Sequence, residues 1–276
     1  TEPVSVKVSF SGFDFSVVPD QNFATSRASA AEAQVTCIAF KVFDENNKEF
    51  YAEKKTKGTN ENFDQINCEL PAGKYTFVAV AHKAKTPSNG AADIVSPDKA
   101  VINDIMLYKS TYATTMSVDI TRGEPKDVTM NFGKRITASF MLRTTDPYPE
   151  EVDEVEIIID PDQNVGTPNQ YTFNPSTGFS FAKQSYTTNI YKKNTPNNSF
   201  IDGPMISCFL TATEQVVNVK VNMKDSSGKL IRTRTFNAVT LKQNCTTKAT
   251  GYFFTNSVSN GYTFDTTDDE ELSYAF

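Results

Sequence analysis

The segment from Leu70 to His82, LPAGKYTFVAVAH, constrains the fold of this chain more than any other. A Pro-Ala-Gly turn leads directly into a strand, in which successive side chains leave opposite faces of a sheet. Both sets of side chains are largely apolar: Tyr75, Phe77, Ala79 and Ala81 on one face, and Thr76, Val78, Val80 and His82 on the other. The pattern predicts a central strand covered on both faces, or one whose outer face meets another protein.

Strand patterns dominate the rest of the chain as well. The sequence has 21 Phe, 11 Tyr and no Trp, together with many β-branched residues and frequent Gly, Pro and Asn breaks. The stretches 45–48 (ENNK) and 225–228 (DSSG) have the composition of hairpin turns. A short helix is predicted only over residues 98–108. This composition is typical of an all-β extracellular protein.

Residues 144–151, TTDPYPEE, interrupt the strand pattern with two prolines and a group of charges. Proline cannot take part in a central hydrogen-bond ladder, and the pattern restarts after this stretch. We therefore predict two antiparallel β-sandwich domains, residues 1–146 and 147–276, the second with a candidate donor strand in its tail. The expected core residues are Tyr75, Phe77, Phe140 and Leu142 in the first domain, and Ile157, Ile159, Val219 and Val221 in the second.

Charge and hydropathy exclude two classes of function. The formal net charge is −6, and the longest basic cluster is Lys54, Lys55 and Lys57. Nucleic-acid binding needs a more concentrated positive surface. No apolar run reaches the roughly 18 residues of a spanning helix, so the chain itself is not expected to cross a membrane. The start at Thr1 indicates that any secretory signal was removed or left out.

The residues that enzymes use are scarce. His82 is the single histidine, and it lies within an apolar strand, so we expect a structural imidazole and not a general base. The sequence has no phosphate-binding or dinucleotide fingerprint. Carboxylates can act in catalysis, but the acidic stretch 268–271, DDEE, is most simply interpreted as a solvated tail. We expect no enzymatic activity and no cofactor.

Metal binding has one weak candidate. Asp160, Asp162 and Asn164 resemble the start of a calcium loop, but Gly166 comes one place late and position twelve is Tyr171 instead of Glu. A surface turn fits this segment better, and no metal site is expected. The four cysteines, Cys37, Cys68, Cys208 and Cys245, form no C-x-x-C pair. They fit either buried thiols or two bridges, Cys37–Cys68 and Cys208–Cys245.

The two ends of the chain carry matching apolar alternations. Val4, Val6, Val8 and Phe10 predict a half-buried first strand, followed by a loop of small and polar residues over 19–33 that contains Arg27. At the other end, Leu272, Tyr274 and Phe276 alternate with small residues. This segment fits a strand added to an open sheet edge, or a last strand folded onto its own domain.

Several segments resemble the fimbrillin-type subunits of the type V pili of Bacteroidales. They are VTCIAFKVFDENNKEF, LPAGKYTFVAVAH, FNAVTLKQNCTTKATGYFF (236–254) and Arg135 with the following TASFMLRTTD. The resemblance implies two transthyretin-like or immunoglobulin-like sandwiches and export to the cell surface and outer membrane. It also implies a lipid anchor on a cysteine before Thr1, and other pilus subunits as partners.

The resemblance further implies assembly by strand exchange. An arginine-specific protease cuts such subunits after the first strand, which makes Arg27 the candidate cleavage site and Val4, Val6, Val8 and Phe10 the displaceable strand. Leu272, Tyr274 and Phe276 are then the candidate donor strand. The rival function is a surface lipoprotein that binds host or bacterial glycans and never polymerises; its candidate stacking platforms are Tyr148, Tyr171, Tyr186 and Tyr191.

Overall fold

The computed structural model describes residues 2–12, 35–60, 62–84, 90–103, 105, 111–160, 170–187, 191–193, 203–254 and 263–268, with the backbone alone for Tyr191 and for 263–268. All regular structure in these ranges is strand, which confirms the predicted all-β class. The helix expected over 98–108 is wrong at its start, because residues 99–102 form a strand in which Ala100 and Ile102 alternate with more exposed neighbours. Within the same ranges, no helix suited to crossing a membrane is found.

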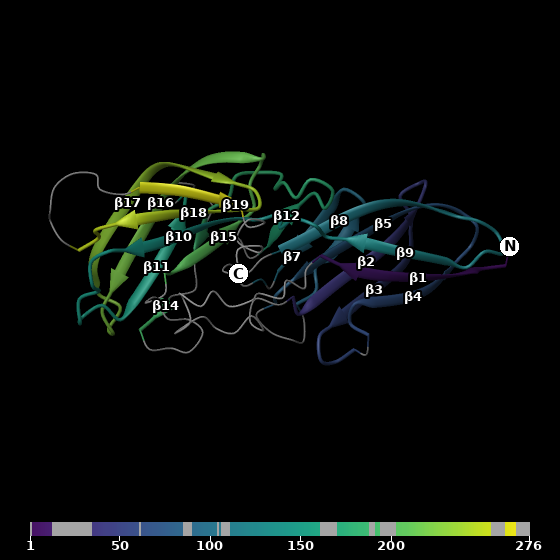
Figure 1. Cartoon of the computed structure of the whole chain (residues 1–276), viewed down its shortest axis with the longest axis horizontal. Coiled ribbons are helices and arrows are strands. Elements are labelled where there is room, and N and C mark those ends of the chain that lie inside the picture. Colours follow the sequence, from purple (N-terminus) through teal and green to yellow (C-terminus); the bar gives the residue numbers. More distant parts are fainter. Residues whose placement is uncertain are drawn as a thin grey trace. The chain divides into compact units, whose positions relative to one another are not determined.

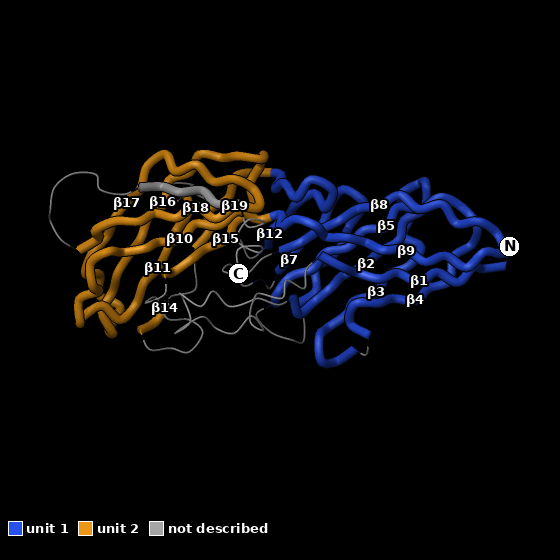
Figure 2. Tube along the Cα trace, in the orientation of Figure 1, with its two compact units in different colours: residues 1–15, 34–136, 169–181 blue, residues 16–33, 137–168, 182–276 orange. Residues whose placement is uncertain are grey.

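The chain divides into two compact units (Figure 2). Unit 1 contains residues 1–15, 34–136 and 169–181. Its sheets have the strand orders β4-β1-β9, β3-β2-β5-β8 and β12-β7-β6 (Figure 1). The strands are β1 (Val4–Ser11), β2 (Cys37–Asp44), β3 (Glu49–Thr56), β4 (Gln65–Leu70), β5 (Gly73–His82), β6 (Asp93–Ser96), β7 (Lys99–Ile102), β8 (Thr111–Ile120), β9 (Lys126–Asn131) and β12 (Tyr171–Phe173).

The core of unit 1 lies between the first two of these sheets. The β1 valines, Ile66 and Leu70 of β4, and Phe40 and Phe77 of the facing sheet belong to one buried cluster. Aromatic rings meet edge to face within it, with 5.5 Å between the ring centroids of Phe40 and Phe77. Apolar burial of this kind is the main favourable term in folding a β-sandwich.

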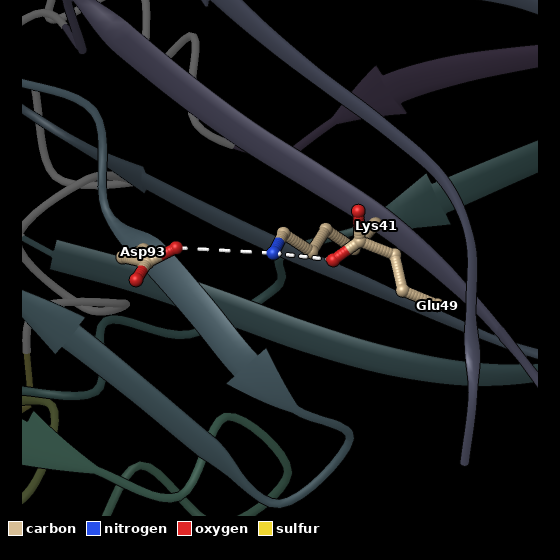
Figure 3. Close-up of polar contacts among 3 residues, drawn as sticks. All are labelled: Lys41, Glu49 and Asp93. Carbon is tan, nitrogen blue, oxygen red and sulfur yellow. Dashed lines mark hydrogen bonds and ion pairs between the residues drawn. The ribbon is translucent and has the colours of Figure 1, made fainter.

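The opposite face of β5 is also covered. Val78, Val80 and His82 are 0% exposed, and β6 of the small third sheet lies against β2 and β5. The sequence left open whether this face is covered by the chain itself or by another protein. The structure shows that the chain itself covers it. Lys41 of β2 bridges Glu49 (2.7 Å) and Asp93 of β6 (3.8 Å), which ties the third sheet to this face (Figure 3). Both carboxylates are largely exposed, so these ion pairs contribute at most about 1 kcal/mol.

Unit 2 contains residues 16–33, 137–168 and 182–276. It has two sheets, with the orders β15-β10-β18-β19 and β13-β11-β16-β17, and β14 also pairs with β11. The strands are β10 (Ala138–Thr144), β11 (Glu154–Ile159), β13 (Tyr186–Thr187), β14 (Tyr191–Lys192), β15 (Met205–Cys208), β16 (Glu214–Lys224), β17 (Leu230–Lys242), β18 (Cys245–Gly251) and β19 (Thr263–Asp268). Ile157, Ile159, Val219 and Val221 are buried in this unit as expected.

The division between the units differs from the boundary expected at residue 147. It falls between Ile136 and Thr137, because β10 pairs with β15 and β18 of unit 2. Phe140 and Leu142 are therefore buried in unit 2 and not in the first core. Residues 169–181 belong to unit 1, since β12 pairs with β7. The prolines at 147 and 149 mark the end of a strand instead of a change of unit.

The two predicted hairpins are confirmed, and both use the same turn chemistry. The Asp44 carboxylate accepts the backbone N–H groups of Asn46 and Lys48, and Asn47 has a φ of 61°. The Asp225 carboxylate likewise accepts N–H groups from Ser227 and Lys229, with Gly228 at a φ of 83°. Asn and Gly tolerate this left-handed backbone, so the sequence determines both turns locally.

Candidate assembly interface

The first strand, β1, lies in the middle of its sheet. It pairs antiparallel with β4, from Val4 opposite Leu70 to Ser9 opposite Gln65, and parallel with β9, from Val6 opposite Lys126 to Ser11 opposite Asn131. The parallel pair departs from the purely antiparallel sandwich that we predicted. β1 and β9 are the first and last strands of the stretch 1–136 of unit 1, and they run side by side in the same direction.

In β1, the side chains that are apolar in the sequence are the ones that are buried in the structure. Val4 is 4%, Val6 and Val8 are 0% and Phe10 is 5% exposed, whereas Ser5 and Lys7 face solvent. The Phe10 ring stacks at 6.0 Å on Phe132, just beyond β9. Burying a valine or phenylalanine side chain contributes roughly 1.5–3 kcal/mol, an upper estimate for each. β1 therefore supplies a large part of the core of unit 1.

β1 comes before every other described strand of the chain, and residues 12–36 separate it in sequence from β2. One cut between β1 and β2 would therefore leave β1 held in unit 1 by non-covalent contacts alone. β10 holds the same place in unit 2, antiparallel to β15 and parallel to β18, but other described strands precede and follow it in sequence. Removal of β1 would open a groove between β4 and β9 with unpaired backbone groups on both sides.

The other predicted assembly residues fall outside the described part of the chain. These are Arg27 and the loop around it, and the tail residues Leu272, Tyr274 and Phe276. The last described strand, β19, pairs antiparallel with β18, from Cys245 opposite Asp268 to Thr250 opposite Thr263. The tail thus begins directly after a strand at the edge of unit 2.

A group of contacts that the sequence did not predict holds the chain where β18 ends. The buried Asp146 carboxylate accepts the backbone N–H groups of Phe253 (2.8 Å) and Phe254. From the other side, Arg232 and Arg234 of β17 donate to the carbonyl oxygens of the same two residues, and the Arg234 guanidinium lies 5.3 Å from the Phe253 ring centroid. We call Asp146, Arg232, Arg234, Phe253 and Phe254 the 253–254 clamp. The partners are up to 108 positions apart, so no local pattern could reveal them.

The comparisons with known proteins point to fimbriae. The family model of the fimbrillin-A associated anchor proteins Mfa1 and Mfa2 matches residues 1–200, well over half of the chain. The chain belongs to this family. The expected likeness to fimbrillin-type subunits is thereby confirmed, and the protein is a fimbrial protein of the cell surface. Comparison with curated protein sequences finds no significant match.

Solved structures confirm the fold. A candidate polysaccharide-binding protein from Bacteroides thetaiotaomicron is 13% identical with a TM-score of 0.50, covering 97% of this chain and 96% of its own. The tip fimbrial protein Mfa3 from Porphyromonas gingivalis, truncated at its C-terminus, is 10% identical with a TM-score of 0.50, covering 96% of this chain and 99% of its own. At such low identity the likeness concerns the fold alone.

The described residues that were considered for catalysis and metal binding are buried or hydrogen-bonded within the fold of this fimbrial protein. His82 is 0% exposed and lies opposite Cys37 and Thr111 in the sheet. The Asp160 carboxylate accepts the backbone N–H of Asn218 at 2.9 Å, while Asp162 and Asn164 lie outside the described residues. Among the described residues, no group of His, Cys, Asp or Glu has the arrangement of a metal site.

The tyrosines considered as sugar platforms are mostly part of the two cores. Tyr171 is 5% and Tyr186 is 2% exposed, and the Tyr186 hydroxyl donates to the Phe209 carbonyl oxygen. Tyr148 packs edge to face on Phe254, and burial raises the pKa of its hydroxyl to about 12. The side chain of Tyr191 is outside the described set. The buried rings cannot present a face to a sugar in this conformation.

The four cysteines are free and buried, which decides between the two alternatives left by the sequence. Cys37 and Cys68 belong to different sheets of unit 1. Cys208 lies opposite Ala138, so β10 separates it from β18, which begins at Cys245. Two strand spacings of about 4.8 Å exceed the Cα separation of about 7 Å that a disulfide tolerates.

Thiol labelling checks this assignment. Burial, with a smaller contribution from the Glu53 carboxylate, raises the pKa of Cys68 to about 11. The nucleophile is the thiolate, which at pH 8 is then about one thousandth of the Cys68 population. We expect an aromatic disulfide reagent to label the four thiols very slowly in the folded protein and rapidly in guanidinium. Labelling of fewer than four thiols after unfolding without a reductant would contradict free cysteines.

Proposed function

We propose that this chain is a non-enzymatic fimbrial subunit that joins other subunits by strand exchange, with β1 as the strand that is displaced. One observation carries the proposal: β1 is central in its sheet, contributes buried side chains, and precedes every other described strand. A single cut between β1 and β2 would therefore turn a central strand into a bound peptide, which is what strand exchange requires of an acceptor. Export as a lipoprotein and attachment to the outer membrane are proposed from the family.

The energetics favour capture of a new strand once β1 has gone. Backbone N–H and C=O groups of β4 and β9 would lose their partners, and the cluster containing Ile66, Leu70 and Val128 would face water. Unpaired edges and exposed apolar grooves are costly and drive pairing with another chain. An incoming strand with apolar residues at every second position would replace Val4, Val6 and Val8. The tail residues Leu272, Tyr274 and Phe276 have this spacing.

Cleavage after Arg27 is the proposed trigger, and a pair of substitutions tests it. We expect an arginine-specific protease to cut the wild type, release β1 and produce polymers visible by electron microscopy. Arg27→Lys should resist this enzyme, keep β1 and form none of the polymers that depend on its loss, yet be cut by trypsin and then assemble. Arg122→Ala, at an exposed turn arginine, is the matched control and should assemble like the wild type. A wild-type chain that loses β1 and remains monomeric, or an uncut Arg27→Ala chain that polymerises equally well, would contradict the proposal.

The donor is tested separately by changing the tail. The triple variant Leu272→Ser, Tyr274→Ser, Phe276→Ser keeps the backbone but removes the apolar side chains. We expect it to be cut normally and to accept a wild-type tail, while failing to extend polymers by itself. Chain growth at the wild-type rate would show that another segment is the donor.

A further inference from the structure

The two units repeat one arrangement of strands. In unit 1, β1 lies between antiparallel β4 and parallel β9, and the facing sheet has the order β3-β2-β5-β8. In unit 2, β10 lies between antiparallel β15 and parallel β18, and the facing sheet has the order β13-β11-β16-β17. β9 and β18 are therefore counterparts, as are β8 and β17. The counterparts differ at one edge, because β18 carries β19 on the side away from β10.

No described strand pairs with the corresponding edge of β9. The backbone N–H of Phe132 donates to the Ser11 carbonyl oxygen at 3.0 Å, so the backbone groups of Met130 and Val128, two and four positions earlier, also point toward β1. The N–H and C=O groups of Asp127, Thr129 and Asn131 then point away from β1. β9 therefore presents a row of strand-pairing groups on the side where β18 binds β19.

An exposed apolar side chain lies on β8, a strand that contacts β9. Met116 of β8 is opposite Phe77 in the sheet and so belongs to the inner face of the sandwich. It is nevertheless 39% exposed, although Val118 on the same face is 6% exposed. In unit 2, β19 lies against β17, the counterpart of β8, as well as pairing with β18. The inner face of unit 1 is left uncovered where a counterpart of β19 would lie.

We propose that the outer edge of β9, together with Met116, accepts an antiparallel strand from the tail, residues 269–276, of a second copy of this chain. The donor keeps β19 on its own β18 and offers the residues that follow it. Their alternating Leu272, Tyr274 and Phe276 can extend the inner face over Met116. In antiparallel alignment the acidic start of the tail lies toward the end of β9 that leads to exposed Lys134.

This inference rests on the proposed function in one respect: the partner that supplies the strand is another subunit. It requires neither cleavage after Arg27 nor departure of β1. A subunit that keeps β1 in place could therefore still bind a neighbouring subunit through this contact. The groove left by β1 and the outer edge of β9 are two acceptors for one tail: the groove opens only after cleavage, whereas the edge is open before it.

The test uses full-length Arg27→Ala chain, so that β1 cannot be released, with the photo-crosslinking residue benzoylphenylalanine at position 116. We expect irradiation to give a crosslinked dimer, with the new bond mapped by mass spectrometry to residues 269–276 of the second copy. A crosslink within one chain, a crosslink to another segment, or no crosslink above background would each overturn the proposal. Polymerisation of the cut wild type is a separate result that these outcomes leave unchanged.

Two variants of the edge test the same contact without crosslinking. Proline is tolerated on an edge strand where its missing N–H faces solvent, so Thr129→Pro removes one outward donor and leaves the β1 pairing intact. We expect it to raise the Kd of a labelled 269–276 peptide at least about tenfold relative to Thr129→Ala, which keeps the N–H. Met116→Gln leaves the backbone unchanged and should also weaken binding. Equal affinities for Thr129→Pro and Thr129→Ala in folded protein, or unchanged affinity of Met116→Gln, would overturn the proposal.

Discussion

Val6→Asp should destabilise unit 1 by at least about 3 kcal/mol, because the new carboxylate would be buried without a partner between two sheets. Val6 is 0% exposed and lies opposite Cys68 of β4 and Lys126 of β9 in the sheet. Ordinary domains are stable by only 5–15 kcal/mol, so this single change removes a large part of the margin. Thermal unfolding should show it as a fall in the Tm of unit 1 of about 10 °C or more.

The neighbouring residue provides the control. Lys7 belongs to the same strand, but its side chain faces solvent. Lys7→Asp makes the larger change of charge and should nonetheless alter stability by no more than about 0.5 kcal/mol. If both variants lose stability equally, or neither does, then β1 is not held as a central strand and strand exchange through it is wrong.

Asp146→Ala should cost about 3 kcal/mol in unit 2, because two backbone N–H groups would lose a charged acceptor. The N–H groups belong to Phe253 and Phe254, and Phe253 is 0% exposed. The 253–254 clamp holds the chain between β18 and the segment that leads to β19. We therefore expect hydrogen exchange to rise first in residues 245–254, ahead of global unfolding.

An exposed carboxylate near Asp146 separates this effect from a general loss of charge. Glu151 is exposed, and Glu151→Ala should leave both stability and exchange nearly unchanged. A second variant, Asp146→Asn, keeps one carbonyl oxygen and should fall between the wild type and Asp146→Ala. Wild-type exchange in residues 245–254 of Asp146→Ala would show that the arginine contacts suffice to hold this segment.

The sequence predicted best the features that arise from neighbouring residues. Alternation with a period of two predicted β1, since only one register buries all the apolar side chains of that strand. A turn followed by a run that is apolar on both faces predicted β5 as a strand covered on both sides. Asp44 and Asp225 bond to backbone groups within four positions, so both hairpins could be recognised from a few letters. The helix predicted over 98–108 failed at residues 99–102 because pairing with β6 and β12 prevails over weak local preference.

Long-range pairing decided what the sequence left open or misplaced. Residues 138–144 form a strand under either assignment, and only the partners β15 and β18 place β10 in unit 2. The choice between thiols and disulfides depended on which strands separate the cysteines. The 253–254 clamp and the exposure of Met116 depend on where strands end and on how two sheets face each other. The hydrophobic periodicity of the sequence contains no information on either. By itself, therefore, the sequence determined the strands, their buried faces and their turns, because those follow from contacts a few residues apart. Only the tertiary structure decided the sheet partners, the unit boundary and the open edge of β9, because these follow from contacts between residues far apart in the chain.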